Sequence, residues 1–266
     1  MVSKLIFLKL GGSLITDKTS VEAVRPDVLA RLAAEIGRAL KTSDDLSLLV
    51  GHGSGSFGHV AAATHGTRSG ADTRDQWRGF AEVSSAAARL NAIVRKALVD
   101  AGVPAITFQP SASAMCSDGH IESMSVDPIL RSLEKGLVPI VYGDVAIDKI
   151  IGGTIISTEE ILTFLTPYLN PSAILLAGET EGVLDDSGNT IESIFEKELG
   201  SVYHAIGGSR GTDVTGGMAS KVEEMVELAA AYPSLKIRIL SGLVEGAVEQ
   251  ALINPSVNIG TLVAAG

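Results

Sequence analysis

The sequence predicts an α/β protein in which a mostly parallel β-sheet is flanked by helices. Short apolar runs of strand type alternate along the chain with longer stretches of helical periodicity. The 266 residues, 45% of them hydrophobic, are enough to bury a large core. Glycine-rich loops follow directly after two of the expected strands, and open α/β sheets bind ligands at such strand ends. One fold class therefore accounts for the pattern of the whole chain.

The composition excludes several classes of protein. The formal net charge of −10 argues against a surface that binds nucleic acid, since such a surface is basic. One cysteine, Cys116, allows neither an intrachain disulfide nor a metal site built from cysteines. No apolar run reaches the roughly 18 residues that cross a bilayer, and the N-terminus lacks the pattern of a secretion signal. We therefore expect a cytoplasmic protein without a membrane partner.

The N-terminal half is expected to alternate strands with helices. Pro26 suits the first turn of a helix over 25–40, whose apolar residues recur at three and four positions. Asp118 and Gly119 predict a tight turn. The other elements expected here are strands over 4–10, 46–50, 105–108 and 137–141 and helices over 72–101 and 126–135.

The C-terminal half continues this alternation. Residues 145–147 and 154–156 can pair as a hairpin. Ser157 and the acidic residues after it predict the start of a helix that ends near Leu169. The remaining elements are strands over 173–176, 236–240 and 258–263 and helices over about 213–231 and 244–253.

Lys9 ends the first expected strand and is followed closely by Gly11, Gly12 and Ser13. A lysine at the end of a buried strand is costly to desolvate unless it meets an anion. The glycines let the backbone turn sharply and bring N–H groups close to a ligand. The simplest anion that explains this combination is a phosphate.

A second glycine-rich loop, residues 51–59, follows the strand over 46–50 and closes with His59. Its letters include Gly-x-Gly-x-x-Gly, but no acidic residue follows at the end of a second strand, so the dinucleotide-binding motif is incomplete. The sequence also lacks the P-loop motif and the nucleophile elbow of α/β hydrolases.

A third glycine-rich element, residues 213–221, opens a helix. Gly216 and Gly217 expose its first N–H groups, and Lys221 follows within two turns. Because helical side chains lean towards the N-terminus, Lys221 adds positive charge where the helix dipole already favours a phosphate.

Lys9, Lys18, His59 and Lys221 together indicate a site that handles phosphate without a protein nucleophile. This pattern is typical of direct, in-line phosphoryl transfer, which depends on positioning and charge neutralisation. Asp144, after the strand over 137–141, is a candidate to orient the lysines.

An apolar stripe near the start of the helix over 72–101 has two interpretations. Trp77, Phe80 and Val83 share one face because they are spaced at three residues. They either pack in the core or form the wall of an apolar pocket.

Five motifs resemble the amino acid kinase superfamily: KLGGS at 9–13, ITDK at 15–18, GSFGH at 55–59, VPIVYGD at 138–144 and DVTGGMASK at 213–221. The resemblance runs from about residue 4 to residue 263. Within the superfamily the sequence looks most like the isopentenyl phosphate kinases, and the GSFGH and DVTGGM motifs are the specific ones.

The resemblance implies a single domain over 1–266 with a three-layer αβα fold, usually a homodimer. It implies an N-terminal lobe, about 1–170, that binds the phosphoryl acceptor, and a C-terminal lobe, about 171–266, that binds ATP. Mg²⁺ would be held mainly through the ATP phosphates, without a dedicated protein metal site. The implied acceptor is isopentenyl phosphate, and the implied product is isopentenyl diphosphate.

The resemblance also implies roles for individual residues. Lys9 and Lys18 would neutralise the transferring phosphoryl group, and His59 would hydrogen-bond the acceptor phosphate. The residues expected to bind ATP are Lys9, Gly11, Gly12, Ser13, Gly55, Glu179, Gly216, Gly217 and Lys221. Those expected to bind the acceptor are Ser54, Gly55, Gly58, His59, Asp144, Thr158, Phe80 and Val83.

Two segments, 157–160 and 178–182, depart from the family's usual letters, and Thr158 replaces a common glycine near the acceptor. Two alternatives therefore stay open. The first is a kinase for another small phosphate or phosphonate, such as fosfomycin. The second is a non-catalytic nucleotide-binding regulator, although retention of Lys9, Lys18 and Lys221 argues against it.

Overall fold

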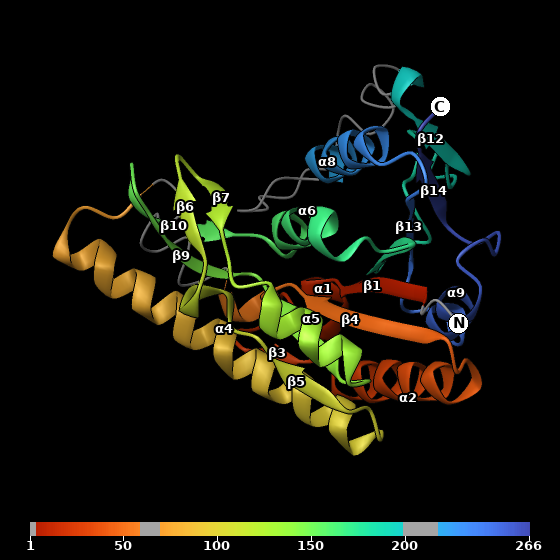
Figure 1. The fold of residues 1–266 in the computed structure, drawn as a ribbon, viewed down its shortest axis with the longest axis horizontal. Helices are drawn as coiled ribbons and strands as arrows, with labels where there is room; N and C mark the ends of the chain where they lie inside the picture. Colours follow the sequence, from red (N-terminus) through yellow and green to blue (C-terminus); the bar gives the residue numbers. More distant parts are fainter. Residues whose placement is uncertain (1–3, 59–69, 199–217) are drawn as a thin grey trace.

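The structure, a computed structural model, describes residues 4–58, 70–198 and 218–266 (Figure 1). Its main sheet is parallel except for one antiparallel pair of strands. In order across the sheet the strands are β12 (Ser193–Phe195), β14 (Thr261–Ala264), β13 (Lys236–Ser241), β11 (Ala173–Gly178), β1 (Lys4–Leu10), β4 (Leu46–His52), β8 (Val138–Tyr142) and β5 (Ala105–Thr107). The α/β class and the mostly parallel sheet are confirmed.

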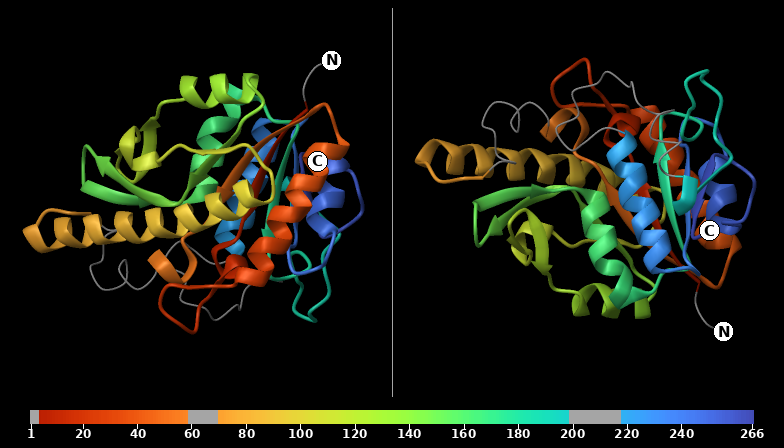
Figure 2. Two further views of the ribbon diagram at one scale, coloured as in Figure 1. Left: turned by 90° about the horizontal axis from the view of Figure 1, so that it is seen from below. Right: turned by 90° about the horizontal axis from the view of Figure 1, so that it is seen from above.

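Helices cover both faces of this sheet, which gives three layers (Figures 1 and 2). The helices on one face are α2 (Pro26–Thr42), α4 (Arg74–Asp100) and α9 (Ala247–Ile253). Those on the other face are α5 (Asp127–Glu134), α6 (Thr158–Leu169) and α8 (Met218–Ala231). The described part of the chain contains no helix that is long and apolar enough to cross a bilayer.

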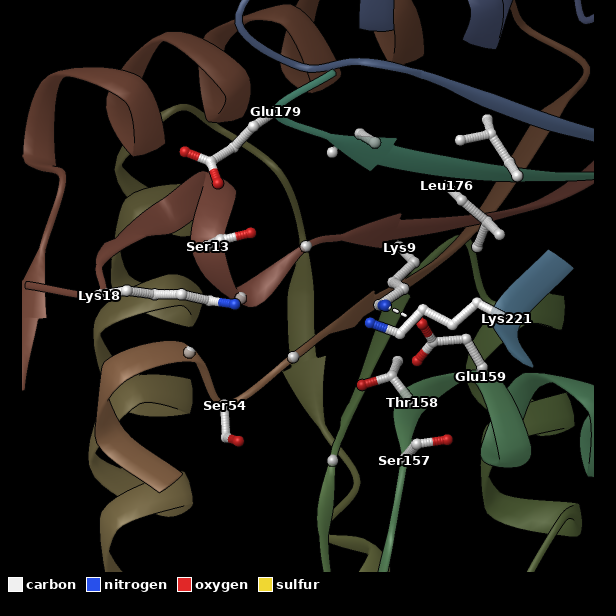
Figure 3. Close-up of a pocket in the computed structure, with 18 of the residues that line it drawn as sticks. Lys9, Ser13, Lys18, Ser54, Ser157, Thr158, Glu159, Leu176, Glu179 and Lys221 are labelled. Atoms are coloured by element: carbon white, nitrogen blue, oxygen red, sulfur yellow. Dashed lines mark hydrogen bonds and ion pairs between the residues drawn. The ribbon is translucent and has the colours of Figure 1, made fainter. Parts of the chain in front are cut away.

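Strand β1 lies in the middle of the sheet, between β4 and β11. Its side chains alternate between the two cores: Leu8 packs with the α2 side, whereas Phe7 packs with the α6 side. Lys9 shares the face of Phe7, so its side chain extends towards α6 and α8 (Figure 3). Lys9 is the only charged residue among the last four of β1, and its side chain lies on the face that α6 and α8 cover.

A smaller sheet stands over the N-terminal half of α4 (Figure 1). Its strands, in order, are β10 (Gly152–Ile156), β9 (Asp144–Asp148), β6 (Met115–Ser117) and β7 (His120–Ser123). Asp118 and Gly119 both have positive φ and form the predicted turn, here between β6 and β7. Val83 of α4 packs against Val145 and Ile155 of this sheet.

Asp148 ties the turns of the small sheet together. Its carboxylate accepts backbone N–H groups from Asp118 at 3.1 Å and Gly119 at 2.7 Å. It also accepts from Ile150 at 2.8 Å and Ile151 at 3.0 Å. One buried side chain therefore joins the β6–β7 and β9–β10 connections.

Several short elements were not expected from the sequence. In the β6–β7 pair only Cys116 is buried, so the pair lacks the apolar alternation that predicts strands. Strands β4 and β11 each run two residues further than expected, because β4 pairs with β1 as far as His52 and β11 pairs with β13 as far as Gly178. The remaining short elements are α1 (Gly12–Ile15), β2 (Thr16–Asp17), β3 (Ala23–Val24), β12, and the 3₁₀ turns Pro110–Ala112 and Glu196–Glu198.

Candidate active site

A pocket of about 270 Å³ lies at the carboxyl ends of β1, β4 and β11 (Figure 3). These strands are parallel neighbours, so their following loops meet at one edge of the sheet. Predicted site residues that line the pocket are Lys9, Gly11, Gly12, Ser13, Lys18, Ser54, Gly55, Thr158, Glu179 and Lys221. His59, Gly216 and Gly217 lie outside the described residues.

The first two glycine-rich loops touch each other backbone to backbone. A Cβ atom on Gly12 would lie 2.7 Å from Gly55 Cα, and one on Gly53 would lie 2.9 Å from Gly12 N. Gly53 N also donates to Leu10 O at 3.1 Å. Only glycine fits at these contacts, so the two loops pack closely against each other at the wall of the pocket.

The start of α6 sits directly on β4. Gly51 has no side chain, and a Cβ there would lie 2.6 Å from Thr158 Cγ2. Thr158 Oγ1 donates to His52 O at 2.7 Å, and Ser157 and Glu160 form a reciprocal capping box at the helix start. These contacts fix the first turn of α6 beside the end of β1.

Glu159, in that first turn, forms a buried ion pair with Lys9 (Figure 3). The side chains of Lys9 and Glu159 are only 11% and 5% exposed. Burial alone would raise the pKa of the Glu159 carboxyl, but the charges of Lys9 and Lys221 outweigh it and lower this pKa. Glu159 is therefore a carboxylate that balances the positive charge of the two lysines.

A second carboxyl group, Glu224 of α8, lies close to this ion pair. Thr163 Oγ1 donates to its Oε1 at 3.2 Å. Burial, followed by the negative charges of Glu159 and Glu160, raises the pKa of Glu224 to about 7. The sequence contained no signal for this proximity, because it depends on how α8 packs against α6.

Asp144, predicted to orient the lysines, accepts backbone hydrogen bonds in the structure. The ion pair of Lys9 is formed by Glu159, while Asp144 accepts backbone N–H groups from Ser111 at 3.2 Å and from Val145 at 2.9 Å. Its carboxyl is almost fully buried, and burial raises its pKa. Asp144 begins the small sheet, directly after Gly143 of the pocket lining, and its predicted role stays a prediction.

Three further predicted acceptor residues are described but do not line the pocket. Gly58 is buried in the helical turn over 55–58. Phe80 and Val83 pack against Ile155, which does line the pocket. They therefore lie behind the apolar wall of the pocket rather than forming its surface.

The geometry suits a ligand with several negative charges. Lys9, Lys18 and Lys221 reach one pocket from β1, from the β2–β3 turn and from α8. Figure 3 shows Lys18 between Ser13 and Ser54, and Lys221 beside Lys9 and Glu159. Lysines and glycine N–H groups stabilise phosphate oxygens by charge and by hydrogen bonds.

Comparison with known proteins shows the family of the chain. Residues 4–241 match the model of the Amino acid kinase family. A protein named isopentenyl phosphate kinase from Methanothermobacter thermautotrophicus is 34% identical over 95% of this chain and 97% of its own length. One of the same name from Haloferax volcanii is 37% identical over 85% of this chain and 89% of its own.

The fold is also similar to that of solved structures. An X-ray structure of isopentenyl phosphate kinase superposes with a TM-score of 0.81 and 31% sequence identity. The alignment covers 97% of this chain and all of that one. Sequence and fold therefore agree over nearly the full length.

Proposed function

This chain belongs to the amino acid kinase family and, within it, to the isopentenyl phosphate kinases, and on that premise we propose that it phosphorylates isopentenyl phosphate with ATP. The product would be isopentenyl diphosphate, an isoprenoid precursor. One observation carries the proposal: Lys9, Lys18 and Lys221 line one pocket together with residues of the first two glycine-rich loops.

The proposed reaction is a direct in-line transfer. A phosphate oxygen of the acceptor bonds to the γ-phosphorus of ATP, the bond from that phosphorus to the β–γ bridging oxygen breaks, and ADP leaves. Lys9 and Lys18 neutralise the group in transfer, and Lys221 neutralises the ATP phosphates. No side chain needs to form a covalent bond, because this chemistry depends on positioning and charge.

We assign ATP to the side of β11 and α8, where Glu179 and Lys221 line the pocket. The acceptor phosphate is assigned to the second loop, with Ser54, Gly55 and His59. Mg²⁺ would neutralise charge across the ATP phosphates. We assign the ligands of Mg²⁺ to phosphate oxygens and water, which this ion commonly keeps when it binds with a nucleotide.

The apolar tail of the acceptor is assigned to the wall formed by Ile155 and Ile156. Phe80 and Val83 support Ile155 from behind. A five-carbon chain gains free energy from burial against such a surface, whereas a polar tail does not. The proposal therefore favours a prenyl phosphate over a polar phosphonate such as fosfomycin.

A coupled assay of ADP release tests this function. We expect turnover with isopentenyl phosphate, and a loss of about 10²- to 10³-fold in kcat for Lys18→Ala. Lys41→Ala removes an exposed lysine of α2 and is the matched control, expected to be silent. Lack of turnover with every short prenyl phosphate would refute the proposal, and turnover with fosfomycin alone would favour the alternative.

The family resemblance also supports a cytoplasmic homodimer. Sedimentation of the purified chain tests the dimer, and fractionation of cells tests the location. A monomer at micromolar concentration would contradict the proposed assembly.

A further inference from the structure

The hairpin that carries Lys18 is too short to hold itself in place. Strands β2 and β3 pair only through two residues each, Thr16 with Val24 and Asp17 with Ala23. Even longer isolated hairpins are marginally stable in water. Lys18 nevertheless lines the pocket from the connecting turn (Figure 3). Its position must therefore come from contacts outside the hairpin.

Two buried hydroxyl groups make these contacts. Thr16 Oγ1 donates to Gly12 O at 2.7 Å and accepts from Ser56 N at 2.9 Å. Ser56 Oγ accepts from Ala23 N at 3.1 Å and donates to Ala23 O at 3.3 Å. Thr16 is fully buried, and Ser56 is 4% exposed. We call these two residues with their hydrogen bonds the Thr16–Ser56 clamp.

The Thr16–Ser56 clamp joins the hairpin to the glycine-rich loops that line the pocket. Gly55 has a φ of +49°, and a Cβ there would collide with Thr16 Oγ1 and lie 2.6 Å from Gly12 O. Ser56 directly follows Ser54 and Gly55, which line the pocket. A shift of the second loop would therefore move the backbone that holds the hairpin.

The far side of the hairpin is fixed by a weaker contact. Glu22 N donates to Ser56 O at 3.4 Å, and its carboxylate forms an ion pair with Arg89 of α4, with Arg89 Nε 3.1 Å from Oε2. Arg89 is half exposed, so water weakens this pair. The buried hydroxyls of the Thr16–Ser56 clamp are therefore the stronger contact.

We propose that Ser56 is a positioning residue, which sets the place of Lys18 relative to the second loop. The inference rests on the proposed function for the identity of the reaction, but its contacts stand independently. A catalytic group displaced by about 1 Å can cost on the order of 100-fold in rate. Ser56 thereby couples the acceptor loop to the lysine that acts on the transferring group.

A double-mutant comparison tests this coupling. We expect Ser56→Ala to lower kcat by about 10- to 100-fold with the KM for ATP unchanged. In a Lys18→Ala background the same change should have no further effect on kcat, because Ser56 acts through Lys18. An equal fractional loss in both backgrounds would overturn the proposal.

Hydrogen exchange gives a test that does not depend on activity. Ser56→Ala should speed amide exchange in residues 16–25 and leave the central strand β4 unchanged. Unchanged exchange in the hairpin would overturn the proposal. If wild type lacks turnover with isopentenyl phosphate, the proposed function fails, and the exchange result still decides whether the hairpin is clamped.

Further variants cover the case in which Ser56→Ala does not fold. Thr16→Ser keeps the bridging hydroxyl and should retain kcat, whereas Thr16→Val removes it and should behave like Ser56→Ala. Arg89→Gln removes the exposed ion pair with Glu22 of the same hairpin. It should speed amide exchange in the hairpin by less than Ser56→Ala does. Ser132→Ala removes a hydroxyl that donates to Pro128 O at 2.8 Å in α5, far from the pocket, and should alter neither readout. Equal behaviour of Thr16→Ser and Thr16→Val would also contradict the proposal.

Discussion

At the scale of single residues, Glu159 fixes the side chain of Lys9 through a buried ion pair. The pair is buried between the end of β1 and the first turn of α6. Lys9 therefore lines the pocket with its charge already balanced by Glu159. A phosphate that arrives meets a lysine whose position is already set, which lowers the cost of organising the site.

Glu159→Gln should weaken both stability and activity. The change leaves the Lys9 charge without its buried partner, at a cost of roughly 3 kcal/mol in the free energy of unfolding. Urea unfolding and the coupled assay measure the two effects. Glu82→Gln, in the exposed pair with Arg78, is the matched control and should change little. Equal effects of the two substitutions would contradict the structural role of Glu159.

The same substitution should change how stability depends on pH. Because the folded-state pKa of Glu159 is lowered, its stabilisation is complete above the pKa of an unfolded glutamate and is lost as pH falls through the folded value. The Glu159→Gln variant should lack this part of the acid destabilisation.

Glu224 should make stability depend on pH in the opposite direction to Glu159. Its folded-state pKa is raised to about 7, so the fold loses stability as pH rises from the unfolded pKa to that value. We expect Glu224→Gln to stabilise the protein at pH 8 by on the order of 1–3 kcal/mol, measured by urea unfolding. Glu227→Gln, on the exposed side of the same helix, is the control. A variant less stable than wild type at pH 8 would contradict this assignment.

At the scale of elements, the small sheet depends on Asp148. Four backbone N–H groups donate to this carboxylate. The two connections that it joins have little apolar burial of their own, since Ile150 is 69% exposed. Ile155, at the pocket wall, belongs to the same sheet. The shape of the acceptor side therefore depends on a polar contact remote from it.

Asp148→Ala should lower the free energy of unfolding by roughly 3 kcal/mol, because four backbone N–H groups lose their hydrogen bonds to a buried carboxylate. Thermal unfolding measures the effect. Asp185→Ala removes a carboxylate with similar backbone contacts in an exposed turn and should change little. A small effect of Asp148→Ala would mean that the small sheet holds its turns by packing alone.

The elements that sequence reasoning found and missed differ in how they are stabilised. Strand 4–10 was predictable because its apolar run is buried on both faces. The β2–β3 and β6–β7 pairs were not, because tertiary hydrogen bonds from Ser56 and Asp148 hold them. The secondary-structure propensity of a short segment does not reveal such tertiary contacts.

At the scale of the whole molecule, the lysines of the site could be predicted from the sequence, whereas the ion pair between Lys9 and Glu159 could not. Lys9, Lys18 and Lys221 could be assigned to one site because each lies in or beside a glycine-rich motif of the family that the sequence resembles. The Lys9–Glu159 pair joins residues 150 positions apart and depends on how α6 seats on Gly51 and β4. The roles of His59, Gly216 and Gly217 stay predictions, since these residues lie outside the described ranges.

The two expected lobes, about 1–170 and 171–266, should not fold separately. Strand β1 pairs on one side with β4 and on the other with β11, so each fragment would lack a central neighbour. We expect fragment 1–170 to show no cooperative thermal transition, and to regain one when 171–266 is added. Circular dichroism measures both. A cooperative transition of 1–170 alone would show that the lobes are independent.

The order of strands in the main sheet has a consequence for aggregation at high protein concentration. Among the described residues, its two outermost strands, β12 and β5, have three residues each. Long free edges invite β-strands of other molecules to add and start aggregates, and short ones offer few backbone groups to bind. The long apolar strands lie inside the sheet, where such addition cannot reach them. Edge-to-edge aggregation through the main sheet should therefore be resisted at high concentration and should require prior unfolding.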